Sequence, residues 1–239
     1  MTTPSATPSL ESVGSTFDAW AADGRAEGME DDHRDVVLQM LDRAELAPQH
    51  HVLDVGCGTG WTVRLLARVV AQGRAHGVDL SGQMIARARS AATPANASFT
   101  AAPVHALPFA TDSLDRVVSM ESIYYWSELE AGLREIRRVL RPGGRFLVAM
   151  EYFRENPHSA HWGRRMGLAL HHLSAPEWEA RLQDAGFTQV GSELLHDRRR
   201  RQTAAEFGAD PCHPDYQNYL AHKEAGALLL RAGKAPAQD

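Results

Sequence analysis

A turn rich in glycine lies where a short β-branched run passes into a helical pattern. It carries four residues of interest at alternate positions, namely Asp54, Gly56, Gly58 and Gly60. Glycine adopts positive φ angles freely and lets a ligand approach the backbone closely. The free amides at the start of the following helix add hydrogen-bond donors at the same place. The spacing therefore predicts a turn that binds a cofactor.

Two well-known nucleotide-binding motifs do not fit this turn. The dinucleotide fingerprint G-x-G-x-x-G, counted from Gly56, needs a glycine at position 61, where the chain has Trp61. A phosphate-binding P-loop needs G-K-S or G-K-T, and the sequence contains neither. Asp79 ends the next predicted strand, where an acidic side chain in such a sheet accepts hydrogen bonds from a ribose. The turn is therefore predicted to bind a ligand that carries a ribose.

A second group of residues could serve a reacting substrate. It follows two predicted strands, at 114–120 and 145–150, and comprises Glu121, Tyr124, Tyr125, Trp126 and Glu151. The carboxyl ends of parallel strands meet at one edge of an open sheet, where ligands bind. A carboxylate there can act as a general base or hold a cationic substrate, and aromatic rings favour a planar or cationic ligand. The alternatives are rings that pack under the next helix and a solvated loop carboxylate.

The segment from Phe17 to His33 mixes large apolar residues, glycines and charges. Trp20 and Met29 could close over a reactive site, with nearby glycines as hinges. His33 could reach that site as a base near neutral pH. The segment is therefore predicted to cover the site. An amphipathic segment that leads into the first helix would use the same apolar residues, and that alternative stays open.

Three further features have plainer interpretations. The histidines at 158, 161, 171 and 172 lack the cysteines or carboxylates that complete a known ligand pattern, so no metal site is predicted. Cys57 is interpreted as a small filler within the glycine turn. The run Arg198 to Arg201 could contact RNA phosphates, but it lacks interleaved aromatic residues, so a solvated loop is favoured.

Helical and strand patterns alternate along the chain and would position these residues. Helices are predicted near 31–44, 62–70, 81–91, 128–140 and 174–186, and strands near 51–56, 74–80, 97–102, 114–120, 145–150, 188–195 and 226–233. This alternation predicts an α/β, doubly wound fold, with a mainly parallel sheet and helices on both faces. Residues 1 to about 15 are rich in Ser, Thr and Pro, so a loose tail is expected there.

Composition and charge narrow the class of function. The chain has 239 residues and a formal net charge of −5, which disfavours nucleic acid as its main partner. It has two cysteines and lacks a positively charged start followed by an apolar run, so a cytoplasmic protein is expected. No apolar stretch approaches the roughly 18 residues of a membrane span.

Four ordered motifs resemble the class I S-adenosylmethionine-dependent methyltransferases, and among them the quinone and sterol type. They are "VLDVGCGTG" from Val52, "VDLS" from Val78, "LPFATDSLDRVVS" from Leu107 and "EIRRVLRPGGRFLVAM" from Glu135. The resemblance implies a Rossmann-like sheet of seven strands with the last one antiparallel, and S-adenosyl-L-methionine as cofactor. We accordingly expect a flexible tail and site cover at 1–30 and one domain at 31–239. Lid-like insertions are expected near 153–173 and 197–225.

The resemblance also implies roles residue by residue. The expected cofactor contacts are Asp54, Gly56, Cys57, Gly58, Thr59, Gly60, Asp79, Leu80, Met84, Val104 and Ser119. Among them, Asp54 would approach the methionine amino end, Asp79 would bind the ribose, and Ser119 would offer its backbone to the amino group. The chain departs from the family at Ala102, Pro103 and Val104, where members often carry an aspartate for the adenine. Backbone groups near Val104 and His105 would then have to recognise that ring.

Methyl transfer is an in-line displacement, so the protein has to align an acceptor and exclude water. The expected catalytic residues are Glu121, His33 and Tyr124, and the expected acceptor pocket contains Trp20, Met29, Tyr125, Trp126 and Glu151. The predicted function is S-adenosylmethionine-dependent methyl transfer to a small-molecule acceptor. Two alternatives stay open, namely an RNA or protein methyltransferase and a cofactor-binding regulator without catalysis.

Overall fold

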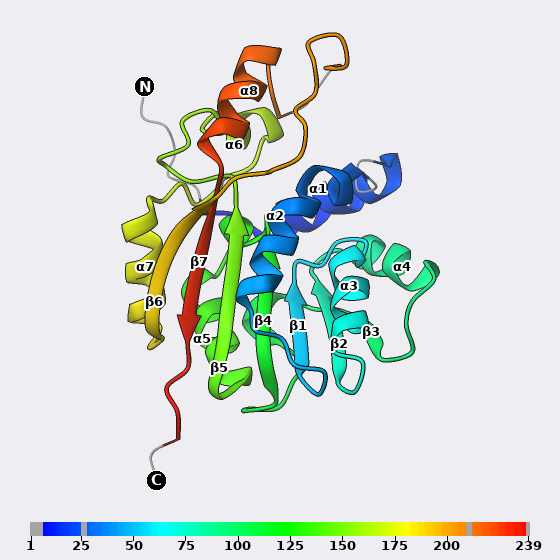
Figure 1. Cartoon of the computed structure of the whole chain (residues 1–239), viewed down its shortest axis with the longest axis vertical. Helices are drawn as coiled ribbons and strands as arrows, with labels where there is room; N and C mark the ends of the chain where they lie inside the picture. The colour runs from blue at the N-terminus through cyan, green and yellow to red at the C-terminus, as the bar shows by residue number, and fades with distance from the viewer. Residues whose placement is uncertain (1–6, 25–27, 209–211, 238–239) are drawn as a thin grey trace.

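Seven strands form one sheet in the computed structural model of the chain, in the order β3-β2-β1-β4-β5-β7-β6 (Figure 1). The structure describes residues 7–24, 28–208 and 212–237. The strands are β1 His51–Val55, β2 Arg74–Asp79, β3 Ala97–Ala101, β4 Leu114–Met120, β5 Leu140–Met150, β6 Thr188–Leu195 and β7 Ala227–Gly233. The helices are α1 Leu10–Asp23, α2 Met29–Arg43, α3 Trp61–Val69, α4 Gly82–Ser90, α5 Leu129–Val139, α6 Trp162–Met166, α7 Ala175–Asp184 and α8 Tyr216–Ala225, with short 3₁₀ turns η2 Val104–Ala106 and η3 Ile123–Tyr125.

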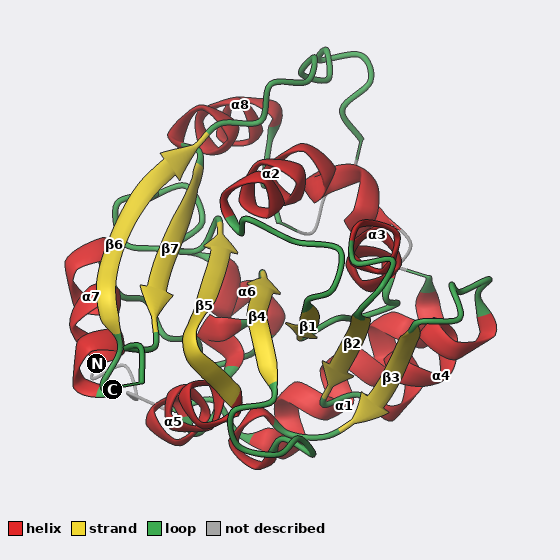
Figure 2. Cartoon of the chain, turned by 60° about the horizontal axis from the view of Figure 1, so that its bottom comes forward, coloured by secondary structure: helices red, strands yellow, loops and turns green. Residues whose placement is uncertain are grey.

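The central strands are parallel and buried on both faces. Val117 of β4 pairs with Leu53 of β1 and Phe146 of β5, and these three side chains belong to one core. The next residue, Val118, belongs to the second core on the opposite face because side chains alternate along a strand. In Figure 2, α2 and α3 lie on one side of the sheet and α5 and α7 on the other. The doubly wound architecture predicted from the alternating patterns is confirmed.

The last strand runs against its neighbours. β7 pairs antiparallel with both β5 and β6, so the sheet is mainly parallel with its final strand reversed. A capping box between Ser174 and Glu177 begins α7, as the S-x-x-E pattern predicts. Both features agree with the expectations from the sequence.

The N-terminal segment differs from the loose tail expected up to about residue 15. Helix α1 begins at Leu10, where the side chain of Ser9 accepts a hydrogen bond from the Ser12 amide. Val13 and Ala21 are buried. A capped helix with apolar residues on one face can offset its ordering entropy by packing, even within a Ser-rich and Pro-rich composition. The expected tail and cover at 1–30 also includes positions 1–6 and 25–27, which lie outside the described residues.

Strand β5 begins earlier than the sequence pattern predicts. Leu140 already pairs with Leu114, and the register then shifts so that Arg145 pairs with Arg116. Gly143 has a φ of +78°, so the chain forms an irregular excursion at the "RPGG" segment instead of a simple stop. The predicted helix before it, α5, ends at Val139 as expected.

The two predicted insertions contain short helices. α6 lies within 153–173 and α8 within 197–225. Figure 1 shows both near the end of the sheet to which the β4 and β5 arrows point, with α1 and α2 beside them. That end is also where β1 and β2 finish, because all four strands are parallel. The fold thus gathers distant segments over one sheet edge.

Candidate active site

The glycine turn after β1 has the backbone geometry that its sequence predicts. Gly56, Gly58 and Gly60 have φ angles of +75°, +51° and +80°. A Cβ atom on Gly60 would lie 2.4 Å from the ring of Phe99, whereas one on Gly58 would meet no atom within 4 Å. Gly60 is therefore required by packing as well as by its φ angle, and the position of Gly58 leaves the turn open to a ligand.

Asp79, at the end of β2, forms hydrogen bonds that hold this turn in position. Its Oδ2 accepts a hydrogen bond from the Gly58 amide at 2.8 Å, and its Oδ1 accepts one from the Ser81 amide at 2.9 Å. Burial raises the pKa of Asp79, and these two amides oppose that effect. The carboxylate is therefore held in a fixed orientation beside the turn.

Asp54, on β1, lies close enough to Asp79 for their charges to interact. Burial, followed by the charge of Asp79, raises the pKa of Asp54 to about 8. The site thus holds one carboxyl group that is largely protonated at neutral pH beside a second one held by amides.

Most of the predicted cofactor contacts line one cleft, which we call the glycine cleft. They are Asp54, Gly56, Cys57, Gly58, Thr59, Asp79, Leu80, Met84 and Val104. Two predicted contacts lie behind it in the described structure. Gly60 begins α3 against Phe99, and Ser119 is fully buried with its Oγ 2.6 Å from the Oγ of Ser122. Ser122, which follows β4, lines the cleft in place of Ser119.

The glycine cleft is also lined where the chain departs from the family pattern. Pro103, Val104 and His105 form one wall, at the start of η2. Gly132 of α5 packs directly on Val104, because a Cβ atom there would lie 2.9 Å from a Val104 methyl group. Contacts from backbone groups of this wall to a purine remain a prediction.

A larger cavity of about 560 Å³ adjoins the glycine cleft, and we call it the aromatic chamber. The two cavities share wall residues, namely Phe17, Trp20, Met29, His33, Glu121 and Tyr125. Rings of Phe17 and Tyr125 meet edge to face with centroids 5.0 Å apart. Of the predicted acceptor-pocket residues, Glu151 lines only the chamber and Trp126 only the cleft. The remaining three line both cavities.

Helix α1 is fastened over the boundary between the cavities. The hydroxyl of Ser81 donates to the carboxylate of Asp18, and the Gln83 amide donates to the same oxygen at 3.2 Å. Ser81 is also the N-cap of α4, where its Oγ accepts from the Met84 amide at 3.0 Å. Phe17 and Trp20 of α1 are thereby held in the shared wall.

Glu121, directly after β4, is buried in a strained conformation. Its φ of +51° is uncommon for a residue with a side chain and is often found at functional positions. The carboxyl group accepts hydrogen bonds from the Tyr124 hydroxyl and from the Glu151 amide. Burial, and then the charge of Glu151, raises the pKa of Glu121 to about 8. At neutral pH this group is therefore largely protonated.

Glu151, directly after β5, is the ionised member of the carboxyl pair. Lys223 Nζ donates to its two oxygens at 2.8 and 3.2 Å, and His222 Nε2 lies 3.0 Å from one of them. Burial alone would raise the pKa of Glu151, but Lys223 and then His222 hold it well below its usual value. Asn156 Nδ2 lies 3.2 Å from His222 Nδ1 and donates to it, so the proton of the ring is on Nε2, which donates to Glu151.

His33, on the second turn of α2, lies at the boundary of cleft and chamber. Its Nδ1 atom is buried and has no hydrogen-bond partner among the described residues. Burial lowers the pKa of His33 to about 4, against the opposing charge of Glu151. The imidazole is therefore neutral at pH 7 with an unengaged nitrogen. Glu121 lines the same shared wall largely in its protonated form, whereas His33 lines it in the neutral form that can accept a proton.

Several residues of the chamber were not anticipated. Lys223 comes from α8 and Trp162 from α6, both within the predicted insertions, and His222 of α8 lies behind them against Glu151. The arginine run lies in an exposed loop, as predicted, but its side chains form ion pairs. Arg198, Arg199 and Arg200 pair with Asp35, Asp197 and Glu206, respectively. Asp197 and Glu206 are local partners, whereas the pairing of Arg198 with Asp35 is set by the fold.

The histidines that could have suggested a metal site lie in separate contacts. His161 Nε2 is 2.7 Å from the carbonyl oxygen of Cys212, and His171 Nε2 is 2.8 Å from that of Trp126. Across residues 7–24, 28–208 and 212–237, no group of three His, Cys, Asp or Glu residues could hold a metal ion. In those same ranges, no helix is long and apolar enough to cross a membrane.

Comparisons with known proteins agree with this geometry. A family model for a methyltransferase domain matches residues 53–148. A chain from the solved complex between the Haloferax volcanii Trm112 methyltransferase activator and a methyltransferase is 34% identical. The match covers 92% of this chain and 98% of that one, with a TM-score of 0.83.

Curated relatives match the central part of the chain. Methyltransferase GfsG of Streptomyces halstedii is 36% identical over 46% of this chain and 41% of its own length. The chloroplastic 2-methyl-6-phytyl-1,4-hydroquinone methyltransferase of Arabidopsis thaliana is 35% identical over 48% of this chain and 33% of its own. The chain thus spans less than half the length of these two relatives. With a solved relative matched almost end to end and a glycine cleft of the expected form, the chain belongs to the class I S-adenosylmethionine-dependent methyltransferases.

Proposed function

We propose that the protein transfers a methyl group from S-adenosyl-L-methionine to a small-molecule acceptor held in the aromatic chamber. The observation that carries this proposal is the shared wall between the 560 Å³ chamber and the glycine cleft. A cavity of this volume is in the range typical of small-molecule sites. The similarity to a hydroquinone methyltransferase also favours a small, planar acceptor.

The glycine cleft has the groups needed to hold the cofactor. When bound, S-adenosyl-L-methionine supplies an electrophilic methyl group on a sulfonium sulfur. The open face at Gly58 permits close approach to the backbone, and the fixed carboxylate of Asp79 suits a ribose diol. We assign Leu80, Met84 and Val104 to the apolar surround of the adenine, and Ser122 to the lining near the methionine end.

In the chamber, we assign His33 as the proton acceptor. A hydroxyl acceptor has to lose its proton as its oxygen attacks the methyl group, and the neutral imidazole can take it. Glu121, being protonated, is assigned to hydrogen bonding with Tyr124 and with any polar group of the acceptor. Glu151 stabilises the imidazolium that forms, because its charge already raises the pKa of His33.

The acceptor itself would pack between the rings of the shared wall. Trp20, Tyr125 and Met29 surround the boundary of the two cavities, and Trp126 faces the cofactor side. Their apolar surfaces exclude water from the reacting atoms, which methyl transfer requires. Helix α1 then acts as the predicted cover.

The test combines calorimetry with turnover. Titration of S-adenosylhomocysteine should give saturable binding, and a coupled assay for its release across fractionated small metabolites should show turnover. His33→Gln should abolish most of that turnover while S-adenosylhomocysteine still binds. Tight binding without turnover on any fraction would instead support a non-catalytic binder, and absence of binding would refute the assignment of the cleft.

A second candidate concerns a protein partner. The similar Haloferax volcanii chain was solved with the Trm112 methyltransferase activator, so a partner of that kind is a specific alternative for this chain. Its acceptor could then be an RNA or a protein. Gel filtration of this chain with a Trm112-type protein, followed by turnover with and without it, separates the cases. Co-elution together with turnover that requires the partner would favour the second candidate.

A further inference from the structure

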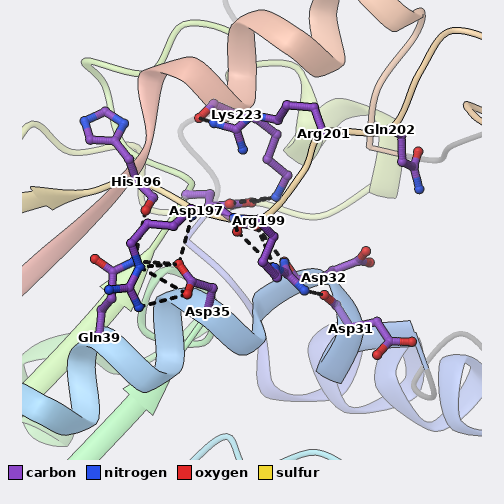
Figure 3. Close-up of polar contacts among 12 residues, drawn as sticks. Asp31, Asp32, Asp35, Gln39, His196, Asp197, Arg199, Arg201, Gln202 and Lys223 are labelled. Atoms are coloured by element: carbon purple, nitrogen blue, oxygen red, sulfur yellow. Dashed lines mark hydrogen bonds and ion pairs between the residues drawn. The ribbon is translucent and has the colours of Figure 1, made fainter.

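The segment 196–201, which we call the arginine strap, crosses helix α2 beside the chamber. It follows β6 and leads toward α8, and Figure 3 shows its side chains between these two helices. The strap contains all four arginines of the run Arg198 to Arg201, for which a solvated loop was favoured over contact with RNA. Its contacts show a different use for them.

Arg199 forms hydrogen bonds with the backbone at the start of α2. Its guanidinium donates to the carbonyl oxygens of Asp31 and Asp32, the latter at 2.9 Å (Figure 3). Asp197 orients the guanidinium by accepting from Nη2 at 2.6 Å and from Nε at 2.9 Å. The planar fork thus joins one strap carboxylate to two consecutive carbonyls of the helix, a geometry that suits arginine and not lysine.

The next two turns of α2 are bound by the rest of the strap. Asp35 accepts from the Arg198 amide at 2.9 Å and from its guanidinium at 2.9 Å. Gln39 Nε2 donates to the carbonyl oxygen of His196 at 2.9 Å. Three successive turns of α2 are therefore joined to one short segment that is distant in sequence.

The other end of the strap reaches the buried pair in the chamber. Arg201 Nη2 donates to the carbonyl oxygen of Lys223 at 3.1 Å, and Lys223 binds Glu151. The strap therefore contacts both α2, which carries His33, and α8, which carries the cation for Glu151. The charge of Glu151 acts on His33 by raising its pKa against the effect of burial.

In the described residues, the first turn of α2 has no side-chain cap. Its N-cap residue is Gly28, which provides no side-chain hydrogen bond to the first turn. The free amides there would ordinarily be satisfied by a capping side chain. His33 follows one residue after the second carbonyl that Arg199 holds, so its place in the shared wall depends on this turn keeping its position.

We propose that the arginine strap positions His33 for proton transfer, with Arg199 as the positioning residue. This inference rests on the proposed function only for the role of His33. The position of α2 itself is a property of the folded chain and can be measured without an acceptor. His33 faces Glu151 from β5, Lys223 and His222 from α8, and Arg199 from the strap.

The experiment compares Arg199→Met with Arg200→Met. Both variants remove one positive charge from the same run, but the hydrogen bonds of the Arg200 side chain in the described residues go to Glu206 and to the Arg201 carbonyl oxygen, not to α2 or α8. In Arg199→Met, we expect amides in residues 32–37 to exchange hydrogen about tenfold faster. We also expect the pKa of His33 to rise by about one unit, because the imidazole gains water and loses a nearby cation.

The His33 side chain is followed by NMR between pH 5 and 7, on protein that binds S-adenosylhomocysteine. It should stay neutral at pH 5.5 in the wild type and in Arg200→Met, and become partly protonated in Arg199→Met. Arg199→Lys keeps the charge but not the fork, so it should resemble Arg199→Met in hydrogen exchange. Wild-type exchange and titration in Arg199→Met, or equal changes in both methionine variants, would overturn the proposal.

Activity provides a separate readout once an acceptor is known. Arg199→Met should lower kcat about tenfold with the KM for the cofactor within about twofold, because the glycine turn is not touched. Altered exchange and titration in a protein that shows no turnover on any acceptor would leave the strap proposal standing. The proposed function would then be the part that failed.

Discussion

The glycine cleft and the aromatic chamber share a wall, yet they are assembled from different kinds of segment. The cofactor-binding part of the cleft is formed by two short runs, 54–59 and 78–80, at the ends of adjacent parallel strands, and α1 and the segments after β3 and β4 complete its walls. The chamber takes its walls from α1, α2, α6 and α8 and from the residues after β4 and β5. A local motif can therefore identify the cleft, whereas only the whole fold forms the chamber.

Electrostatics separates the two regions further. Each has a carboxyl group with a pKa raised to about 8 beside a second carboxylate, Asp54 beside Asp79 and Glu121 beside Glu151. In the cleft, the second carboxylate is held by backbone amides. In the chamber, it is held by Lys223 and His222. Neutral amides suit the binding of hydroxyl groups, whereas a buried lysine keeps Glu151 ionised, and that charge can act on a neighbouring base.

The largest expected effect concerns the packing of the glycine turn. Gly60→Ala should lower the free energy of unfolding by about 3 kcal/mol, because its Cβ would clash with Phe99 at a positive φ. Gly58→Ala is the matched control, with a positive φ but open space, and should cost about 1 kcal/mol. Urea denaturation measures both. Equal losses would show that Phe99 moves aside and that the turn is not tightly packed.

The second prediction separates binding from chemistry. His33→Gln should lower kcat about 100-fold, as expected for loss of a general base, with affinity for S-adenosylhomocysteine within about threefold. Asp79→Asn should do the reverse, weakening that affinity about tenfold while kcat at saturating cofactor changes little. Calorimetry and steady-state kinetics on the two variants provide the comparison. A parallel loss of both quantities in each variant would contradict the division of roles.

The glycine cleft could be predicted from the sequence, whereas much of the aromatic chamber could not. The strand ends and the glycine turn were predicted because their residues are contiguous and their periods are local. Lys223 and Arg199 were missed because a lysine in an exposed-looking helix and a run of arginines give no sign of partners more than 70 positions away, in the buried Glu151 or in the backbone of α2. Helix α1 was missed because a Ser-rich composition concealed its cap at Ser9.

The third prediction concerns stability against pH. Asp54 and Glu121 have pKa values of about 8 in the folded state and about 4 in the unfolded chain. Their contribution to stability is fully present below about pH 4, where both states are protonated. This contribution is lost as the pH rises toward 8. The wild type should therefore lose about 2 kcal/mol more than Asp54→Asn or Glu121→Gln between pH 6 and pH 8.

Denaturation midpoints at the two pH values measure this difference. Glu206→Gln is the control, because the pKa of Glu206 is lowered to about 2 by Arg200 and the group does not titrate above pH 6. Its curve should run parallel to that of the wild type. Parallel curves for Asp54→Asn as well would mean that water reaches the cleft carboxyl group and keeps it ionised.

The smallest expected effect tests how the cover is fastened between the two regions. Ser81→Ala removes the N-cap of α4 and the contact with Asp18, and Ser174→Ala removes the N-cap of α7, far from both cavities. Each should cost about 1 kcal/mol of stability. Only Ser81→Ala should also speed hydrogen exchange in α1, because Asp18 joins α1 to the wall of the cleft. If α1 exchanges alike in both variants, its apolar contacts through Phe17 and Val13 hold the cover without the hydrogen bond, and cleft and chamber are joined by packing alone.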